Sequence, residues 1–341
     1  MDDFKNARIR AASGLLSAVA VAAAALSSGA ALAQAPTNGN LPPGALPSSW
    51  DATYNVCRGT DPKCYRDWVG STRQDRVLIY TRTAGPRHAN LGTALAAGLN
   101  PALGANNVVQ SSLKAWLEAE GITVDWTEDV TQLANLNRYK AVIFASTSRD
   151  TLWKHGTGVS ATAAVNTTTS AYMDAGKVNL RQYMRAGGGF VGIHNALGTE
   201  YNWPWYEGLI GNANYYDHGA NQDGTVQMVG TAEPSGDGVP ASWGFRDEWY
   251  NLVPYPTNVK VLATVDENSL ATKRTVHPGH GSFHPVSWCQ YYDGGRSFVT
   301  SLGHDGQAFT DGSTFPGQAQ FKRHLMQNIK ATMGLTAFCV K

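Results

Sequence analysis

The sequence predicts an α/β fold in which helices cover both faces of a mostly parallel sheet. Three observations favour this class. Short apolar, β-branched runs recur along the chain, segments with helical spacing of apolar residues lie between them, and glycines end those segments. Strands that alternate with helices are typical of parallel sheets.

Four strands are expected in the first half of the domain. They are short apolar runs at residues 77–80, 122–126, Tyr139–Ala145 and 190–193. Between them, residues 108–120 and 170–185 space their apolar side chains as helices do and end close to glycines. The fourth strand runs directly into His194.

The second half of the chain has a different texture. Strands are expected at residues 225–229, 259–265, 286–292 and 296–302, and the turn sequence Asp293-Gly294-Gly295 joins the last two as a hairpin. The final helix is expected at Gln318–Met333, and it ends at Gly334.

The N-terminal segment has the layout of a secretory signal peptide. Lys5, Arg8 and Arg10 precede an Ala-rich run that closes with the small-x-small sequence 31–33. A membrane anchor is the alternative, but the run is weakly hydrophobic and ends in a cleavage signature. No other stretch reaches the ~18 to 20 apolar residues of a spanning helix. We therefore expect a periplasmic or secreted protein without a membrane span after cleavage.

Composition divides the whole chain into four segments. A signal peptide at 1–33 precedes a linker and disulfide-bearing extension at 34–75, the α/β domain at 76–335 and a tail at 336–341. Cleavage lowers the formal net charge from +1 to 0 and leaves no basic run. Nucleic acid is therefore not an expected partner, because phosphate binding needs clustered Lys and Arg.

Four cysteines remain after cleavage, and an even number in an exported chain indicates disulfides. Three pairings are possible. We favour Cys57 with Cys64, which closes a short loop, and Cys289 with Cys339, which ties the tail to a strand. No C-x-x-C sequence is present, so a haem or zinc site at these cysteines is disfavoured.

Three histidines follow predicted strands, where the ligand crevice of a parallel sheet lies. His194 comes directly after the fourth strand, His304 follows the last strand, and His88 lies in the loop after the first. They could be metal ligands, general bases or hydrogen-bond donors, and each alone could be structural. The strand-to-helix turn at His194 resembles a nucleophile elbow, but no G-x-S-x-G occurs, so acyl transfer by Ser or Cys is not expected.

Two further groups could carry chemistry. Asp247 and Glu248 stand beside Trp249 and Tyr250, and a carboxyl group against aromatic rings can act as an acid or a base. An exposed Asp at the start of a loop or helix is the alternative. The sequence His277-x-x-His280-x-x-x-His284 has short zinc-like spacings, although its glycines and proline make it a loop rather than a helix.

Aromatic residues are dense between 201 and 250. Sugar rings stack on such faces, but a packed aromatic cluster is equally compatible with the pattern. The residues that we expect to contact the substrate are Arg87, His88, Trp203, Trp205, Tyr206, His218, Trp249, Tyr250 and His284.

Several segments together resemble the trehalose-utilisation (ThuA-like) family over about residues 76–334. They are Thr83-Ala84-Gly85-x-Arg87-His88, Arg185-Ala186-Gly187-Gly188-Gly189-Phe190-Val191-Gly192-Ile193-His194, Thr199-Glu200-Tyr201-x-Trp203-Pro204-Trp205-Tyr206, Asp247-Glu248-Trp249-Tyr250, His284-Pro285-x-x-Trp288, and Asp293-Gly294-Gly295-Arg296-Ser297-Phe298 followed by Ser301-Leu302-Gly303-His304. The chain departs from the family pattern at Asn195, at Gly219 and in an insertion at 101–107.

The resemblance implies a class I glutamine-amidotransferase-like fold, a flavodoxin-like three-layer sandwich. The nucleophile position of that superfamily falls on His194, so glutaminase activity is not implied. The resemblance also implies a link to sugar metabolism, especially disaccharides and their 3-keto derivatives. It matches the family's pocket at His88, His194, Asp247, Glu248, His284 and His304.

These observations favour an exported enzyme that acts on a glycoside or keto-sugar by hydrolysis, elimination or isomerisation. His194 and His304 would be base and acid, with Asp247 or Glu248 orienting an imidazole or taking a proton. Alternatively, His194, His284 and His304 would hold one divalent metal ion, zinc above all. A sugar-binding protein without catalysis and a zinc-dependent hydrolase of another substrate class are the rival functions.

Overall fold

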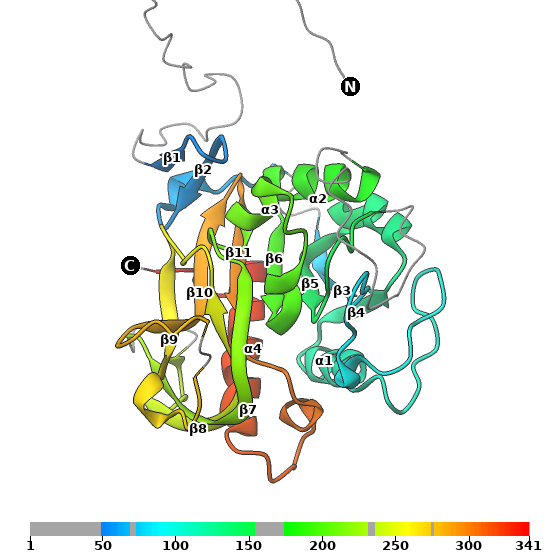
Figure 1. Ribbon diagram of the computed structural model, residues 1–341. Helices are drawn as coiled ribbons and strands as arrows, with labels where there is room; N and C mark the ends of the chain where they lie inside the picture. The colour runs from blue at the N-terminus through cyan, green and yellow to red at the C-terminus, as the bar shows by residue number, and fades with distance from the viewer. Residues whose placement is uncertain (1–48, 69–72, 154–173, 231–235, 274–275, 341) are drawn as a thin grey trace, which may run out of the picture. The chain divides into compact units, whose positions relative to one another are not determined.

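The computed structural model describes residues 49–68, 73–153, 174–230, 236–273 and 276–340. Its strands form one mixed sheet in the order β4-β3-β5-β6-β11-β10-β9-β7-β8 (Figure 1). The strands of the first half are parallel: β4 (Thr123–Thr127), β3 (Gln74–Tyr80), β5 (Tyr139–Ala145), β6 (Gly189–Ile193) and β11 (Gly295–Thr300).

The other half of the sheet is antiparallel. It contains β10 (His284–Tyr292), β9 (Lys260–Asp266), β7 (Tyr215–Met228) and β8 (Ser242–Leu252). The expected α/β class with a parallel core is therefore confirmed, but a flavodoxin-like sheet accounts for only part of the architecture. Antiparallel neighbours need no crossover helix, and β10 and β11 are joined directly by the two-residue turn Asp293-Gly294.

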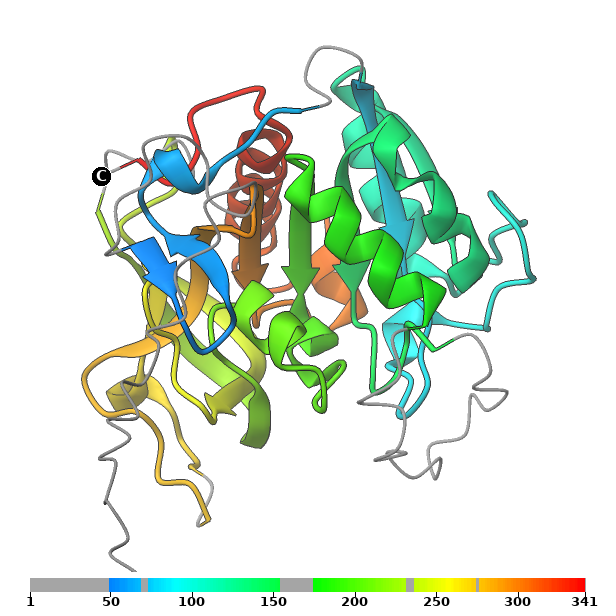
Figure 2. The ribbon, with the colours of Figure 1, turned by 90° about the horizontal axis from the view of Figure 1, so that it is seen from above.

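Helices and apolar side chains cover both faces of the parallel strands. In β3, Val77 and Ile79 belong to the core cluster that includes α1 (Val108–Ala119) and α4 (Gln318–Met333). Leu78 and Tyr80 belong to the opposite cluster, which includes α2 (Ala175–Arg185) and α3 (Pro204–Leu209). This alternation follows from the two-residue period of a strand. Figure 2 shows the sheet between α4 on one side and α2 and α3 on the other.

The sequence places β5 and α4 within the bounds observed, because both have uninterrupted patterns. It misses β8 and the first ten residues of β7, Tyr215–Gly224. These segments mix charged, polar and glycine residues with aromatics, so neither period is visible. The hairpin at Asp293-Gly294 is confirmed, and its two turn residues have φ of 46° and 99°.

The buried carboxylate of Asp293 anchors that hairpin. Arg185 Nε lies 2.9 Å from Asp293 Oδ2, and the Trp205 indole N–H donates to the same oxygen at 2.8 Å. Burial raises the pKa of Asp293, while these partners act in the opposite direction. Asp293 therefore links α2, α3 and the β10–β11 hairpin.

Both favoured disulfides are present: Cys57–Cys64 and Cys289–Cys339. The first lies in the extension formed by β1 (Trp50–Asp51) and β2 (Val56–Gly59), and β2 pairs with β10. The predicted signal peptide lies outside the described residues. Among the residues that are described, no helix is both long and apolar enough to cross a membrane.

Candidate functional site

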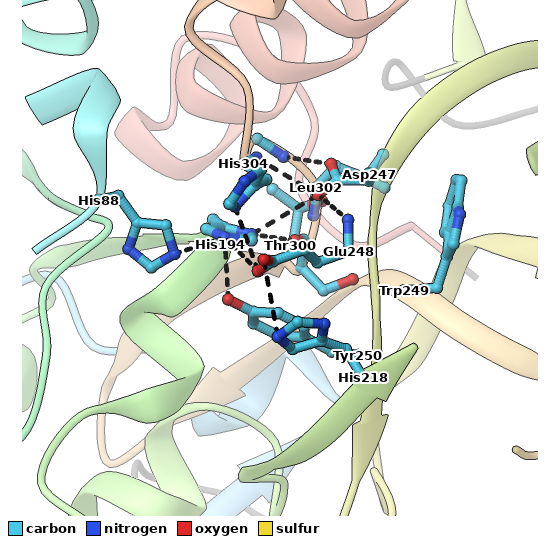
Figure 3. A network of polar contacts seen from close by, with 12 residues as sticks. His88, His194, His218, Asp247, Glu248, Trp249, Tyr250, Thr300, Leu302 and His304 are labelled. Atoms are coloured by element: carbon cyan, nitrogen blue, oxygen red, sulfur yellow. Dashed lines mark hydrogen bonds and ion pairs between the residues drawn. The ribbon is translucent and has the colours of Figure 1, made fainter. Parts of the chain in front are cut away.

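A cluster of polar side chains lies beyond the carboxyl ends of the parallel strands. His88 belongs to the loop after β3, His194 follows β6 directly, and His304 follows β11. Glu248 comes from β8, which is the last strand in the sheet order. Figure 3 shows these side chains converging, so a residue of the antiparallel half contacts the histidines at the carboxyl ends of the parallel strands.

His194 occupies a strained turn. Its φ is 52°, a left-handed value that non-glycine residues seldom adopt, and its side chain is fully buried. The sharp turn between β6 and the short 3₁₀ helix His194–Gly198 presents the imidazole at the end of the strand. The elbow geometry inferred from the sequence is therefore present, with an imidazole in place of a nucleophile.

Hydrogen bonding fixes the tautomer of His194. Its Nδ1 lies 2.8 Å from the carbonyl oxygen of Ser301, and a carbonyl can only accept, so Nδ1 carries the proton. In the neutral ring the lone pair is therefore on Nε2, which faces the cluster. That nitrogen lies 3.1 Å from His88 Nε2 and 2.8 Å from the Tyr250 hydroxyl oxygen.

Glu248 joins the histidines. Its Oε2 lies 3.1 Å from His304 Nδ1 and 3.7 Å from His194 Nε2. One ligand atom from each of His88, His194, Glu248 and His304 lies within 4.8 Å of all the others. We call these four residues the His3Glu cluster. Three imidazoles and one carboxylate are a donor set that suits zinc and related divalent ions.

Asp247 holds the cluster in place from behind. It is fully buried, and its carboxyl oxygens accept from the backbone N–H groups of Gly303 at 2.7 Å, His304 at 3.3 Å and Glu248 at 2.8 Å. Gly303 has a φ of 120°, which directs its N–H toward this carboxyl group. Asp247 thus connects the strand that carries Glu248 to the loop that carries His304.

Burial sets the protonation states of the histidines. It lowers the pKa of His194 well below its ordinary value and, together with the charge of His304, lowers the pKa of His88 to about 4. Both imidazoles are therefore neutral near pH 7, as metal binding requires. Burial also raises the pKa of Asp247 to about 7.

The two remaining members, Glu248 and His304, shift the pKa of each other. Burial would raise the pKa of Glu248, but the hydrogen bond and charge of His304 outweigh burial and lower it. Conversely, burial would lower the pKa of His304, but Glu248 outweighs burial and raises it. The cluster therefore contains an ionised carboxylate beside imidazoles of different basicity.

Two further side chains border the cluster. Burial raises the pKa of Tyr250 well above its ordinary value, so its hydroxyl keeps its proton and donates to His194. His218 donates from Nδ1 to the Gly219 carbonyl at 2.6 Å, which leaves its Nε2 facing Glu248 at 3.6 Å. A cavity of about 350 Å³ opens beside His88 and His304 and gives small molecules access.

The structure does not bring His284 into the cluster. His284 Nε2 donates to the Tyr250 carbonyl oxygen at 2.8 Å, and its Nδ1 lies 2.7 Å from Glu267 Oε1. Both ring nitrogens are thus already engaged, so the geometry does not support His284 as a metal ligand. Burial would raise the pKa of Glu267, but His284, the His280 backbone N–H and Lys273 lower it to about 2.

The aromatic residues expected to line a sugar site lie mainly in the core. Trp203 and Trp205 are each 4% exposed and Tyr206 is fully buried, in the cluster beneath α2 and α3. Trp249 is 2% exposed and donates to the Gln222 carbonyl, away from the cluster (Figure 3). Packing therefore accounts for these side chains without a sugar.

Arg87 lines the cavity, but its guanidinium is committed to the protein. It pairs with Glu128 at 2.7 Å and donates to the carbonyls of Gly92, Leu91 and Thr93. It therefore shapes the loop that carries His88. The Ser301 carbonyl that orients His194 could not be predicted, because backbone groups carry no residue-specific signal.

Comparisons with known proteins agree with this architecture. A family model described as trehalose utilisation (ThuA) matches residues 76–330. A putative ThuA-like protein from Bacteroides uniformis ATCC 8492 has 20% identity and a TM-score of 0.53, with 76% of this chain and 92% of that chain covered.

A second crystal structure supports the same fold. A putative ThuA-like protein from Parabacteroides merdae ATCC 43184 has 17% identity and a TM-score of 0.51, covering 76% of this chain and 89% of its own. Among curated proteins, none matches the chain.

Proposed function

The chain belongs to the ThuA family, described as trehalose utilisation, and on that premise we propose that it is an exported enzyme that processes a carbohydrate at a divalent metal site. The family gives the protein a carbohydrate-related role. The metal, the catalysis and the export are our proposals. Two disulfides support export, because disulfides persist in oxidising compartments.

The His3Glu cluster is the observation that carries the proposal. Its ligand atoms lie within 4.8 Å of one another, and the Ser301 carbonyl directs the lone pair of His194 into their midst. A metal-binding histidine usually donates its other ring N–H in this way. His88, His194, Glu248 and His304 would hold the ion, for which zinc is our first choice.

The cavity beside the cluster suits a small polar substrate. Its volume of about 350 Å³ lies within the ~300 to 1,000 Å³ of small-molecule sites. His88 and His304 belong both to its lining and to the cluster, so a sugar bound there would reach the ion. The Nε2 of His218 would accept a hydrogen bond from a substrate hydroxyl on the Glu248 side.

The proposed substrates are glycosides and keto-sugars, and the reaction is hydrolysis, elimination or isomerisation. A bound divalent ion would polarise a carbonyl or hydroxyl oxygen of the sugar. A keto group makes the neighbouring C–H acidic, and the carboxylate oxygen of Glu248 that does not bind the ion would take that proton. Asp247 would fix the positions of Glu248 and His304 during this chemistry, because it accepts hydrogen bonds from their backbone N–H groups.

Elemental analysis of the purified protein tests the metal first. We expect about one divalent ion per chain in the wild type and loss of that ion in His194→Ala and Glu248→Gln. His277→Ala is the matched control, since this partly buried histidine lies outside the cluster. Metal-free wild type, or equal metal in all four proteins, would refute the site.

Turnover is tested next with a panel of glycosides and keto-glycosides. We expect activity in wild type and His277→Ala, and loss in the two cluster variants. Calorimetric binding of sugars without any product would instead favour the sugar-binding alternative. Metal-dependent hydrolysis of substrates other than sugars would favour the rival hydrolase.

A further inference from the structure

A second cavity lies at the opposite edge of the sheet. It has a volume of about 470 Å³, and its lining includes Tyr65, Arg73, Lys140 and Arg296. Arg73 precedes β3, Lys140 is the second residue of β5, and Arg296 is the second residue of β11. These are the amino-terminal ends of parallel strands, whereas the His3Glu cluster follows the carboxyl ends. A seven-residue strand separates the edges by roughly 20 Å.

The cavity has more positive than negative charge. Lys140 pairs with Asp75, and Asp67 contributes an acidic side chain to the lining. Arg73 and Arg296 form no ion pair with any residue that the structure describes. Among the described groups, two guanidinium charges thus face one carboxylate that pairs with neither. Uncompensated charge of this kind favours an anionic ligand.

Arg73 provides the stronger evidence for an anionic ligand, because its guanidinium is buried. Only 6% of it is exposed, and Nη2 donates to the Ala186 carbonyl at 3.3 Å. Its guanidinium lies over the Tyr183 ring, with Cζ 5.0 Å from the centroid. Within the described part of the chain, the buried Nε has no hydrogen-bond partner. A buried donor without an acceptor is costly, and an anionic oxygen would satisfy it.

Arg296 is held in place from the other side. Its Cζ lies 3.9 Å from the centroid of the Tyr65 ring. A side chain at Gly334 would approach Arg296 Nη1 to 2.5 Å, so the glycine that ends α4 leaves room for this guanidinium. The arginine is therefore oriented before any ligand arrives, which lowers the entropy cost of binding.

We propose that this cavity binds a small oxyanion, a phosphate or sulfate group, through Arg73 and Arg296. Tyr65 supplies a hydroxyl beside the same guanidinium groups. Planar guanidinium groups match the oxygens of phosphate and sulfate in two-point hydrogen bonds. The group could be the free inorganic ion or an ester on a sugar, and the site is separate from the metal cluster.

Isothermal titration calorimetry on the full mature protein tests the proposal, with inorganic phosphate, inorganic sulfate and glucose 6-phosphate as separate titrants. The protein is treated with EDTA beforehand so that no metal binds the anion. We expect saturable binding of at least one titrant. Tighter binding of the sugar phosphate would identify an ester as the ligand, and equal binding would identify the free ion.

Variants assign the binding to this cavity. Arg296→Gln should weaken binding at least about tenfold, because a charge-assisted hydrogen bond is lost. Arg73→Lys keeps the charge at the buried position and should weaken binding less. Arg138→Gln, an exposed arginine outside the cavity, and His194→Ala in the metal cluster should bind as the wild type does.

Two results would overturn the proposal. One is absence of saturable binding by all three titrants. The other is unchanged binding in Arg296→Gln while circular dichroism shows that the variant is folded. Neither result bears on the metal site, whose own test uses metal content.

Discussion

Replacing Tyr250 by Phe should strengthen metal binding, because the Tyr250 hydroxyl occupies the lone pair that a metal would need. The hydroxyl oxygen lies 2.8 Å from His194 Nε2, and Ser301 already occupies the proton on Nδ1. Metal binding at Nε2 therefore breaks the Tyr250 bond. A neutral hydrogen bond contributes about 1 kcal/mol net, which corresponds to roughly a fivefold change in affinity.

The same bond links metal affinity to stability. The metal-free variant should lose about 1 kcal/mol of unfolding free energy, since it lacks this bond. The zinc-loaded variant should lose almost nothing, because the bond is already broken in the loaded wild type. The stabilisation produced by zinc should therefore rise by about 1 kcal/mol in the variant, as linkage requires.

Competition with a fluorescent chelator measures the zinc affinity, and urea titrations with and without zinc measure the stability. Tyr292→Phe is the control, since its buried hydroxyl donates to the Trp205 carbonyl at 2.8 Å, away from the cluster. That variant should lose equal stability in both forms. Weaker zinc binding in Tyr250→Phe would refute the reasoning and make Tyr250 part of the metal site.

Three further perturbations have defined outcomes. The pKa of Glu267 is lowered to about 2 from its ordinary value of 4.5. Its contribution to stability is therefore complete above pH 4.5 and is lost as the pH falls from 4.5 toward 2. Urea midpoints of wild type and Glu267→Gln should converge over that pH window. Removing the Cys289–Cys339 disulfide, which spans 50 residues, should cost about 4 kcal/mol in the same assay, and a cost near zero would contradict the loop-entropy estimate. Trp205→Phe removes the N–H bond to Asp293 and should lower stability by about 1 to 3 kcal/mol while KM for a sugar substrate stays unchanged; a raised KM would instead place Trp205 in the substrate site.

The parallel half of the fold could be predicted because its strands are buried on both faces. A segment such as Tyr139–Ala145 then reads as a continuous apolar run, and its ends are sharp. In β8, Arg246 pairs with Asp223, Glu248 joins the cluster, and Tyr250 contacts His194, so charged and aromatic side chains do not separate into a polar and an apolar face. The residues that form the site thus remove the apolar alternation by which β8 could have been predicted.

The strand-end rule located the three histidines of the cluster correctly in space, since each follows a parallel strand. It could not show which other residue joins them. Glu248 joins the cluster from β8, a strand that the sequence did not predict, and His284 instead bonds to Glu267, a residue with no motif around it. The role of the aromatic residues between 201 and 206 could not be predicted from the sequence, because core packing and sugar stacking use the same side chains.

The ligands of the His3Glu cluster come from both halves of the mixed sheet. Metal uptake therefore depends on correct folding of the whole domain. The donors of the cluster come from the loops after β3 and β6, the loop after β11, and strand β8. No local segment brings two of them together, so a partly folded chain would offer no chelating site. Metal loading would thus require that both halves of the sheet have paired, and an incorrectly paired sheet would bind no metal.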